Sequence, residues 1–402
     1  MRIAFLTTEF LSEKETFDGG LSNYIYKVAI ELIKFGHTPI VFVISNKDEL
    51  INYKGIEVYR VKPKNTFIYK LADKITRFKY QRGLDILRDS YYLNKKLKEI
   101  NKNKKMDIVQ YPNYRSVSFF APKKIKSVLR ISSYQKLLDE ANGLFYKSIK
   151  DRQMQILEDL CYRRAKTIFG PSNFLAKLIS NKYKKTIEVI ETPYYNKNVR
   201  LNYELLEEIK SQTKNGMYLL FFGRLAQLKG VIEISEIINS FLIKFPNYHI
   251  IFIGKDIGYK NSSTVDYIYS KAGGFKNKVL CYPEQNHENL IPVIKDAEII
   301  LLPSRIENLP NACIESMALS KIVIATKGVS FEQLINDKSN GYLCNNNDPE
   351  DLLRTIESVL NLSSEQKKVV ENNAANTILR LHPDVTIKKL TDYYEKIVGQ
   401  NK

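Results

Sequence analysis

The sequence predicts an α/β protein made of two doubly wound domains, each with a parallel sheet covered by helices. Short apolar runs without polar alternation, such as 217–223 and 299–302, are typical of parallel strands buried on both faces. Residues 2–8, a helical pattern at 21–33 and an apolar run at 39–45 form a β–α–β opening, as in doubly wound sheets. The length of 402 residues suits two domains of about 200 residues each.

Further elements follow the same pattern along the chain. In the first half, strands are predicted at 107–111 and 127–132, followed by a long helix at about 139–166. Ser172 is an N-cap signal for a further helix, and a proline-containing linker at 186–196 ends the first domain. In the second half, strands are predicted at 217–223, 249–254, 278–282, 299–302 and 322–325.

The composition is that of an ordinary soluble protein, with 44% hydrophobic and 26% charged residues. The four cysteines, Cys161, Cys281, Cys313 and Cys344, are far apart and have no metal-ligand spacing, which indicates reduced thiols in a cytoplasmic compartment. The opening MRIAFLTT predicts a strand rather than a signal peptide. No apolar run reaches the ~20 residues of a membrane span, so we expect a cytoplasmic protein.

Positive charge is concentrated in the first half of the chain. Residues 1–200 carry 39 Lys and Arg against 20 acidic residues, whereas the remainder carries 23 against 24. A basic surface attracts an anionic partner, such as nucleic acid, anionic lipid or an acidic polymer. The alternative explanation is that the genome encodes lysine-rich proteins in general, and that these charges are only solvated.

The segment 62–105 is basic and has a helical pattern. Its apolar residues form a stripe at helical spacing, and several cations lie beside this stripe. The apolar residues are Phe67, Ile68, Leu71, Ile75 and Phe78, and the cations are Lys70, Lys74, Arg77, Lys79 and Arg82. Such a helix can lie on anionic lipid headgroups, or it can pack its apolar side against the protein core. Peripheral contact with the inner face of the cell membrane is therefore one of two open interpretations.

Two carboxylates flank the start of a predicted helix between the strands 299–302 and 322–325. Eight positions separate Glu307 from Glu315, so on one helix they would not share a face. We therefore place Glu307 in the loop and Glu315 on the helix, which begins near Pro310. The free N–H groups of a helix start suit a ligand with phosphates, and the two acids suit hydroxyl groups on either side.

Glycines and cations precede two other predicted helices. Gly19 and Gly20 end the loop after the first strand, where glycine allows a phosphate or sugar to approach the backbone. Gly223, Arg224 and Lys229 follow the strand 217–223 at the start of a helix. Arg224 can grip phosphate oxygens bidentately and Lys229 supplies a mobile charge, so this loop is a candidate diphosphate cradle.

These motifs together resemble retaining glycosyltransferases of family 4, or glycosyl transferases group 1. The resemblance rests on Glu307 and Glu315 within PSRIENLPNACIESMALSKIVIAT, on GRLAQLKG, and on GGLSNYIYKVAIELIKFGH. It implies the GT-B fold, with two Rossmann-like domains facing across a cleft and a C-terminal helix that crosses back to the first domain. The expected domains are 1–195 with the helix 384–402, which binds the acceptor, and 196–383, which binds the nucleotide sugar.

The resemblance also implies roles for single residues. Glu315 would bind the ribose and Glu307 the transferred sugar, while Asn308, Leu309 and Asn311 would offer backbone N–H groups to the sugar and diphosphate. Arg224 and Lys229 would neutralise the leaving diphosphate. The donor site would also include Gly19, Gly20 and Gly223 near the phosphates.

On the acceptor side this sequence departs from the family. Many members have a histidine at the end of the strand 127–132, where this chain has Ser132 and Ser133. Ser133 and Tyr134 are therefore only acceptor-side candidates. No Asp-x-Asp motif is present, so the scheme requires no metal and no cofactor beyond the nucleotide sugar.

We therefore expect a retaining, metal-independent glycosyltransferase that acts on a glycan or lipid-linked acceptor in bacterial surface polysaccharide synthesis, with UDP preferred over GDP as the donor nucleotide. A nucleotide-sugar 2-epimerase of the same fold is the enzymatic alternative. A basic nucleic-acid-binding protein is the alternative of another class, although no nucleic-acid-binding module is recognisable and we expect no nucleic-acid partner.

Overall fold

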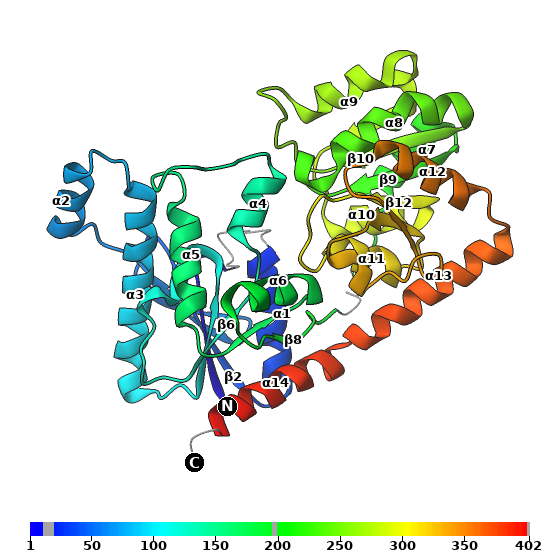
Figure 1. Cartoon of the computed structure of the whole chain (residues 1–402). Coiled ribbons are helices and arrows are strands. Elements are labelled where there is room, and N and C mark those ends of the chain that lie inside the picture. The colour runs from blue at the N-terminus through cyan, green and yellow to red at the C-terminus, as the bar shows by residue number, and fades with distance from the viewer. Residues whose placement is uncertain (11–19, 195–198, 400–402) are drawn as a thin grey trace. The chain divides into compact units, whose positions relative to one another are not determined.

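The computed structural model describes residues 1–10, 20–194 and 199–399, which form two compact units. Unit 1 comprises Met1–Pro193 with Leu381–Lys402, and unit 2 comprises Tyr194–Arg380. Each unit is an α/β structure with its own sheet (Figure 1). Among the described residues, no helix combines the length and apolarity needed to cross a membrane.

Unit 1 contains an eight-stranded sheet in the order β3-β4-β2-β1-β5-β6-β7-β8. Its pairings are parallel except for β3, which is antiparallel to β4. The strands are β1 (Arg2–Thr7), β2 (Thr38–Ile44), β3 (Glu49–Tyr53), β4 (Ile56–Val61), β5 (Ile108–Pro112), β6 (Ser127–Arg130), β7 (Ile168–Gly170) and β8 (Glu188–Val189). The helical elements are α1 (Gly20–Lys34), α2 (Phe67–Ile75), α3 (Gln81–Asn103), η1 (Tyr114–Phe120), α4 (Gln135–Ala141), α5 (Gln153–Arg164), α6 (Asn173–Tyr183) and α14 (Pro383–Gly399).

The first strand shows why the apolar runs of this sequence do not alternate. Ile3 and Phe5 belong to the core on the side of α1 and α14, whereas Ala4 and Leu6 belong to the core on the side of α3, α5 and α6. Successive side chains of a strand point to opposite faces, so a strand covered on both faces needs apolar residues throughout.

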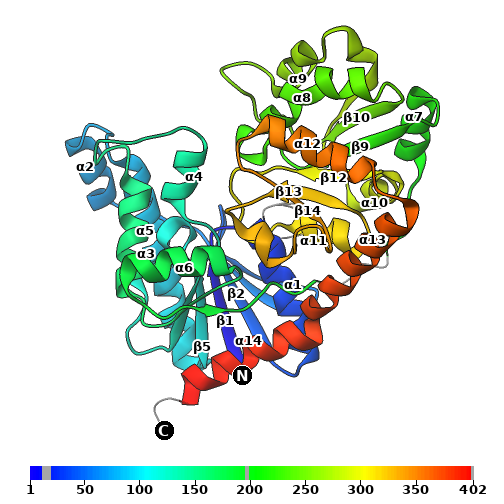
Figure 2. The ribbon, with the colours of Figure 1, turned by 45° about the vertical axis from the view of Figure 1, so that its right-hand side comes forward.

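The C-terminal helix α14 packs on unit 1, as predicted. Its Ile387, Leu390 and Tyr394 are buried in the same core as residues of α1, and both views show the two helices side by side (Figures 1 and 2). The Tyr394 hydroxyl donates a 2.5 Å hydrogen bond to Oε1 of Gln110 on β5.

Two predictions for unit 1 need correction. The expected helix at 139–166 is two helices, α4 and α5, because the chain turns at Asn142 and Gly143, where Gly143 has φ +74°. The hairpin of β3 and β4 was not predicted; its turn has Lys54 and Gly55 at φ +50° and +86°, as a tight two-residue hairpin requires.

Unit 2 contains a six-stranded parallel sheet in the order β11-β10-β9-β12-β13-β14. The strands are β9 (Met217–Phe222), β10 (Tyr248–Ile253), β11 (Val279–Tyr282), β12 (Ile299–Leu302), β13 (Val323–Thr326) and β14 (Tyr342–Cys344). The helical elements are α7 (Glu204–Thr213), η2 (Gln227–Lys229), α8 (Val231–Lys244), α9 (Thr264–Ala272), η3 (Gly273–Lys278), α10 (His287–Asp296), α11 (Asn311–Ala318), η4 (Ser330–Gln333), α12 (Pro349–Leu360), α13 (Ser364–Ile378) and η5 (Leu379–Leu381).

The strand order of unit 2, counted from β9, is 3-2-1-4-5-6, the order of the Rossmann fold. The order reverses between β9 and β12, which lie side by side. Connections that follow these two strands therefore diverge, and the crevice between them is where such a sheet binds its ligand.

Candidate functional site

Lys229 and the first predicted carboxylate of unit 2, Glu307, meet at this reversal point. Gly223, Arg224 and Lys229 follow β9, while Glu307 follows β12. The two connections are joined directly, because the N–H of Arg305 donates a 2.9 Å hydrogen bond to the carbonyl oxygen of Leu228. Residues separated by about 80 positions in sequence thus share one loop cluster.

Glycines allow the backbones of this cluster to approach one another. A Cβ on Gly230 would lie 2.0 Å from the carbonyl oxygen of Pro303, and a Cβ on Gly254 would lie 1.7 Å from that of Gly223. Gly223 and Gly230 also have positive φ, +137° and +80°. No other residue fits these positions without moving the backbone, so the close packing of the loops after β9, β10 and β12 depends on these glycines.

Lys229 and Glu307 form an ion pair between Nζ and Oε1, and both side chains are largely buried. The same Oε1 accepts a 3.2 Å hydrogen bond from Oγ of Ser304, and Oγ of Ser330 donates a 2.7 Å hydrogen bond to the Glu307 carbonyl oxygen. These contacts fix both the side chain and the backbone of Glu307. The structure therefore holds a carboxylate and an ammonium group in contact at the end of the sheet.

The two arginines of the cluster differ in availability. Arg305 Nε lies 2.7 Å from Oε1 of Glu233, a buried carboxylate on α8, and this pair is part of the loop packing. Arg224 is exposed and has no hydrogen-bond or ion-pair partner among residues 1–10, 20–194 and 199–399. Of the two, Arg224 is the guanidinium that can take a new anionic ligand.

Glu315 lies in the second turn of α11, as predicted, and Glu307 lies in the loop before it. Oε1 of Glu315 is 3.3 Å from Nε2 of His287, the first residue of α10. Burial and the nearby negative charge of Glu315 raise the pKa of Tyr194 to about 12. This carboxylate is thus the centre of a second polar group, formed by α10, α11 and the start of the unit.

The start of α11 presents free backbone donors. Pro310 precedes the helix in an extended conformation, φ −78° and ψ 106°, and the N–H of Ile314 is the first to bond within it, to Pro310 at 3.1 Å. The N–H groups of Asn311 and the two residues after it therefore have no intrahelical acceptor. Asn308 and Leu309 are half-buried in the loop before the helix.

Gly20, Ser133 and Tyr134, the predicted residues of unit 1 that the structure describes, form no comparable cluster. Gly20 is the exposed first residue of α1, and Gly19 lies outside the described residues. Tyr134 is buried, and its hydroxyl accepts a hydrogen bond from Lys182 Nζ, so its ring belongs to the core of unit 1. The Ser133 carbonyl oxygen accepts a 2.6 Å hydrogen bond from Nδ2 of Asn113.

Four residues around the carboxylates were not singled out from the sequence: Ser304, Ser330, His287 and Tyr194. Only Ser304 had a signal, because it belongs to the PS pair before Glu307. The others contact Glu307 or influence Glu315 from distant positions in the chain. No local spacing relates them to the motif.

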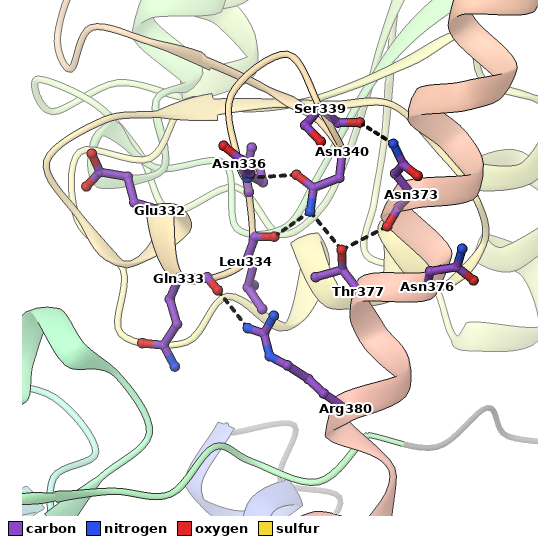
Figure 3. Close-up of a pocket in the computed structure, with 11 residues that line it drawn as sticks. Glu332, Gln333, Leu334, Asn336, Ser339, Asn340, Asn373, Asn376, Thr377 and Arg380 are labelled. Atoms are coloured by element: carbon purple, nitrogen blue, oxygen red, sulfur yellow. Dashed lines mark hydrogen bonds between the residues drawn. The ribbon is translucent and has the colours of Figure 1, made fainter.

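A cavity of about 530 Å³ lies in unit 2 between the 332–340 segment and the end of α13 (Figure 3). It contains none of the predicted site residues. Its polar side chains are largely bonded to one another: Asn340 Nδ2 donates to the Leu334 carbonyl oxygen and to Oγ1 of Thr377, and Arg380 Nη2 donates to the Gln333 carbonyl oxygen. These contacts tie the 332–340 segment to α13, which is a structural role.

Most of unit 2 is similar in sequence to a known family. Residues 202–376 match the family Glycosyl transferases group 1. The matched residues include Gly223, Arg224, Lys229, Glu307 and Glu315, so the loop cluster described above lies within the region of similarity.

Curated relatives are distant and mostly partial. An uncharacterized glycosyltransferase of Haemophilus influenzae is 25% identical over 167 residues, which are 41% of this chain and 44% of that protein. A GDP-mannose:cellobiosyl-diphosphopolyprenol alpha-mannosyltransferase of Xanthomonas campestris is 25% identical over 32% of this chain and 34% of its own. An uncharacterized glycosyltransferase of Methanocaldococcus jannaschii is 20% identical over 98% of both chains. The chain thus spans less than half the length of the first relatives it matches.

Solved structures of similar fold cover nearly the whole chain. Sucrose-phosphate synthase from Thermosynechococcus elongatus has a TM-score of 0.75 at 13% identity, over 99% of both chains. HepE of Anabaena, in complex with UDP and glucose, has a TM-score of 0.68 at 15% identity, over 98% of this chain and 100% of its own. These likenesses confirm the predicted GT-B fold.

Proposed function

We propose that the protein is a retaining glycosyltransferase that moves a sugar from a nucleoside diphosphate sugar to a hydroxyl group. The observation that carries the proposal is the meeting of Lys229 with Glu307 at the strand-order reversal of unit 2. Arg224, two residues after β9, is exposed and unpaired within the described part of the chain. Two cations and a helix start at one site suit a diphosphate. The family match of residues 202–376 supports this assignment.

Leaving-group stabilisation is the proposed role of the two cations. Negative charge develops on the diphosphate as the glycosidic bond breaks, and preorganised donors aimed at that charge supply the largest catalytic contribution. Arg224 is unengaged and can grip the phosphates bidentately. Lys229 and the N–H groups near the start of α11, including those of Asn308, Leu309 and Asn311, complete the cradle. This scheme assigns charge neutralisation to side chains of the chain and requires no metal and no further cofactor.

The two carboxylates are proposed to orient the donor. Glu315 would accept hydrogen bonds from the ribose hydroxyls, and Glu307 would bind the transferred sugar. Because Ser304 and Ser330 hold Glu307, its carboxylate would keep its position when the phosphates draw Lys229 away. We expect front-face displacement with retention, in which the leaving phosphate helps to deprotonate the acceptor.

A lipid-linked or anionic glycan is the proposed acceptor, within bacterial surface polysaccharide synthesis. The Xanthomonas campestris relative is named for transfer from GDP-mannose to a diphosphopolyprenol-linked acceptor, and HepE is described with UDP and glucose. The donor nucleotide is therefore UDP or GDP, and we keep UDP as the first choice. The proposed acceptor-binding part is the basic unit 1, with Ser133 as a candidate contact and the buried Tyr134 next to it in the chain. Gly19 and Gly20 remain candidates on the donor side, near the phosphates.

Nucleotide titration tests the proposal directly. The purified protein is titrated with UDP, GDP and ADP by calorimetry, and the Arg224→Ala variant is titrated in parallel. We expect one nucleoside diphosphate to bind, with affinity reduced about tenfold or more by Arg224→Ala, because a charge-assisted hydrogen bond is lost. Arg354→Ala on α12, an exposed arginine paired with Asp351, is the matched control and should leave affinity unchanged.

The sugar donor then separates transferase from epimerase. With a nucleotide sugar, a transferase releases nucleoside diphosphate only when an acceptor is added, and the product keeps the anomeric configuration of the donor. Interconversion of the nucleotide sugar at C2 without acceptor would contradict the proposal. Absence of binding to all three nucleotides would contradict it as well.

A further inference from the structure

Helix α2 of unit 1 turns its apolar side away from the protein. Phe67 is 78% exposed, Ile75 is 70% exposed, and Leu71 between them is exposed too. These residues are four positions apart, so they lie on one face of the helix. Phe78 follows the helix and is also exposed. An apolar helical face usually packs against a core, and here it does not.

The opposite face of α2 is polar and faces the protein. Asp73 is only 7% exposed, and its Oδ1 has no hydrogen-bond partner among the described residues. Tyr69 donates a 2.8 Å hydrogen bond from its hydroxyl to Oδ1 of Asp85 on α3. The helix is therefore inverted relative to a core-packing helix. This excludes the interpretation that its apolar side packs against the protein core.

The turn after α2 keeps Phe78 on the outward side. Arg77 and Phe78 have φ of +49° and +60°, a region that residues other than glycine rarely adopt. The N–H of Phe78 bonds back to the Asp73 carbonyl oxygen at 2.9 Å, which fixes this conformation. A bulky aromatic residue is thus held in an unfavourable backbone conformation with its ring in solvent.

A second segment adds apolar residues at the same end of unit 1. The connection between α4 and α5, residues 142–152, exposes Leu144, Phe145 and Ile149, of which Phe145 is 72% exposed. Both views place this connection and α2 at one end of the unit (Figures 1 and 2). Gln153 joins them: its Oε1 accepts from the Gly83 N–H at 2.7 Å, and its Nε2 donates to the Lys79 carbonyl oxygen at 3.0 Å.

We call residues 67–82 and 142–152 together the apolar–basic surface. They contain eight Lys and Arg and two acids, and all eight cations are exposed: Lys70, Lys74, Arg77, Lys79, Arg82, Lys147, Lys150 and Arg152. One of the two acids, Asp73, is buried away from the surface. The exposed apolar side chains thus share the two segments with eight exposed cations and one exposed acid.

We propose that the apolar–basic surface docks on a bilayer that contains anionic phospholipids. Apolar side chains enter the boundary between headgroups and acyl chains, while lysine and arginine contact the negative headgroups. A protein partner or a second copy would also bury the apolar residues, but the eight exposed cations of the two segments match a negatively charged bilayer, and two copies of this positive surface would repel each other. This inference rests on the proposed function, because docking would bring the enzyme to a lipid-linked acceptor.

The chain contains no tryptophan, which allows a direct test. Phe67→Trp and Phe145→Trp each introduce a single fluorescent reporter on the surface, and Ile243→Trp introduces one at a 70% exposed position of α8 in unit 2. Each variant is mixed with phosphatidylcholine vesicles with or without phosphatidylglycerol. We expect a blue shift of emission for positions 67 and 145 with anionic vesicles, and none for position 243.

Charge and apolar contributions are then separated by sedimentation with the same vesicles. Lys70→Glu with Lys74→Glu should lower the bound fraction about tenfold or more, because each cation near an anionic surface contributes about 1 kcal/mol. Phe67→Ser with Ile75→Ser should lower it by a similar factor. The matched control is Lys388→Glu with Lys389→Glu, at exposed positions of α14.

Several outcomes would overturn the inference. These are absence of vesicle binding, equal binding to neutral vesicles, or a blue shift at 67 and 145 that depends on protein concentration without lipid, which would indicate self-association. Nucleotide titration of the same samples separates the two proposals. Retained nucleotide binding with no vesicle binding contradicts the docking surface alone, whereas vesicle binding without nucleotide binding contradicts the proposed function alone.

Discussion

The ammonium group of Lys229 and the carboxylate of Glu307 form an ion pair across 78 positions of sequence. Each group thus serves as the charged partner that a ligand would otherwise provide for the other. In the proposed reaction Lys229 binds the diphosphate and Glu307 binds the sugar. The pair thus keeps two partly buried charges compensated until the donor arrives, and donor binding must then exchange this contact for contacts with the phosphates.

We predict that loss of the cations slows turnover more than it weakens binding. Lys229→Ala and Arg224→Ala should each lower kcat by about a hundredfold, because their interaction with the leaving group strengthens as charge develops. Their effect on KM should be smaller. The measurement is steady-state release of nucleoside diphosphate with a saturating acceptor.

The matched control for this prediction is Lys244→Ala, which removes an exposed lysine of α8 paired with Glu357. It should change neither constant. If Lys229→Ala and Arg224→Ala raised only KM, the two side chains would bind the ground state and transition state equally, and the proposed catalytic role would be wrong.

Glu315→Ala should reduce nucleotide affinity by about tenfold to a hundredfold, because hydrogen bonds from ribose hydroxyls to a charged acceptor would be lost. Calorimetric titration with the nucleoside diphosphate measures the effect. Glu350→Ala, an exposed carboxylate on α12, serves as the control. A corresponding ribose-free pyrophosphate ligand should bind both proteins equally; a loss of pyrophosphate binding would point instead to a distorted α11.

Gly230→Ala should disrupt the loop cluster of unit 2. The added Cβ would collide with the Pro303 backbone, and φ +80° is unfavourable for alanine. We expect a clear fall in Tm, from a cost of at least about 3 kcal/mol, together with loss of nucleotide binding. Gly274→Ala is the control, since a Cβ there meets nothing within 4 Å and its φ is not positive. An unchanged Tm for Gly230→Ala would show that the two loops can separate without cost.

Glu158 on α5 should make the stability of unit 1 depend on pH. Burial raises the pKa of this carboxyl to about 8, although it accepts hydrogen bonds from Asn113 Nδ2 and from the Gln135 N–H. In the unfolded chain the group ionises near its ordinary pKa of about 4.3. The folded state therefore binds more protons, and the free energy of unfolding should fall as the pH rises from about 5 to about 8.

The measurement is the pH dependence of Tm for the natural protein and for Glu158→Gln, whose side chain cannot ionise. The difference in Tm between the two should shift in favour of the variant as the pH rises. Glu140→Gln, at a partly exposed position of α4, is the control and should run parallel to the natural protein. Parallel curves for Glu158→Gln would mean that the carboxyl ionises at its ordinary pH.

The strands of the two sheets were predictable because burial on both faces leaves a signal in consecutive residues. A strand such as β12 is buried on both faces, so its residues are apolar without exception and the pattern is visible in four letters. Glu307 and Glu315 could be placed in a loop and on a helix from their spacing alone. The break at Asn142–Gly143 was missed although an Asn-Gly pair is a turn signal, because the helical pattern continues on both sides of it. The break at Arg77–Phe78 has no such signal.

The contacts of the candidate site depend on the folded arrangement of loops. Ser330 reaches the Glu307 backbone, and His287 reaches Glu315, from elements that no sequence spacing connects to the motif. The direction of α2 was also undetermined, because an amphipathic pattern shows that a helix has two faces and not which one meets the protein. Only the burial of Asp73 and the exposure of Phe67 settle that orientation.

The return of α14 to unit 1 has a consequence for how the chain folds during synthesis. Residues that complete the first core, such as Leu390 and Tyr394, are translated after all of unit 2. Domains tend to fold as units while the ribosome still extends the chain. Unit 1 therefore keeps part of its apolar core exposed until the seventeen-residue helix α14 leaves the exit tunnel. Unit 2 can complete its folding before unit 1 does.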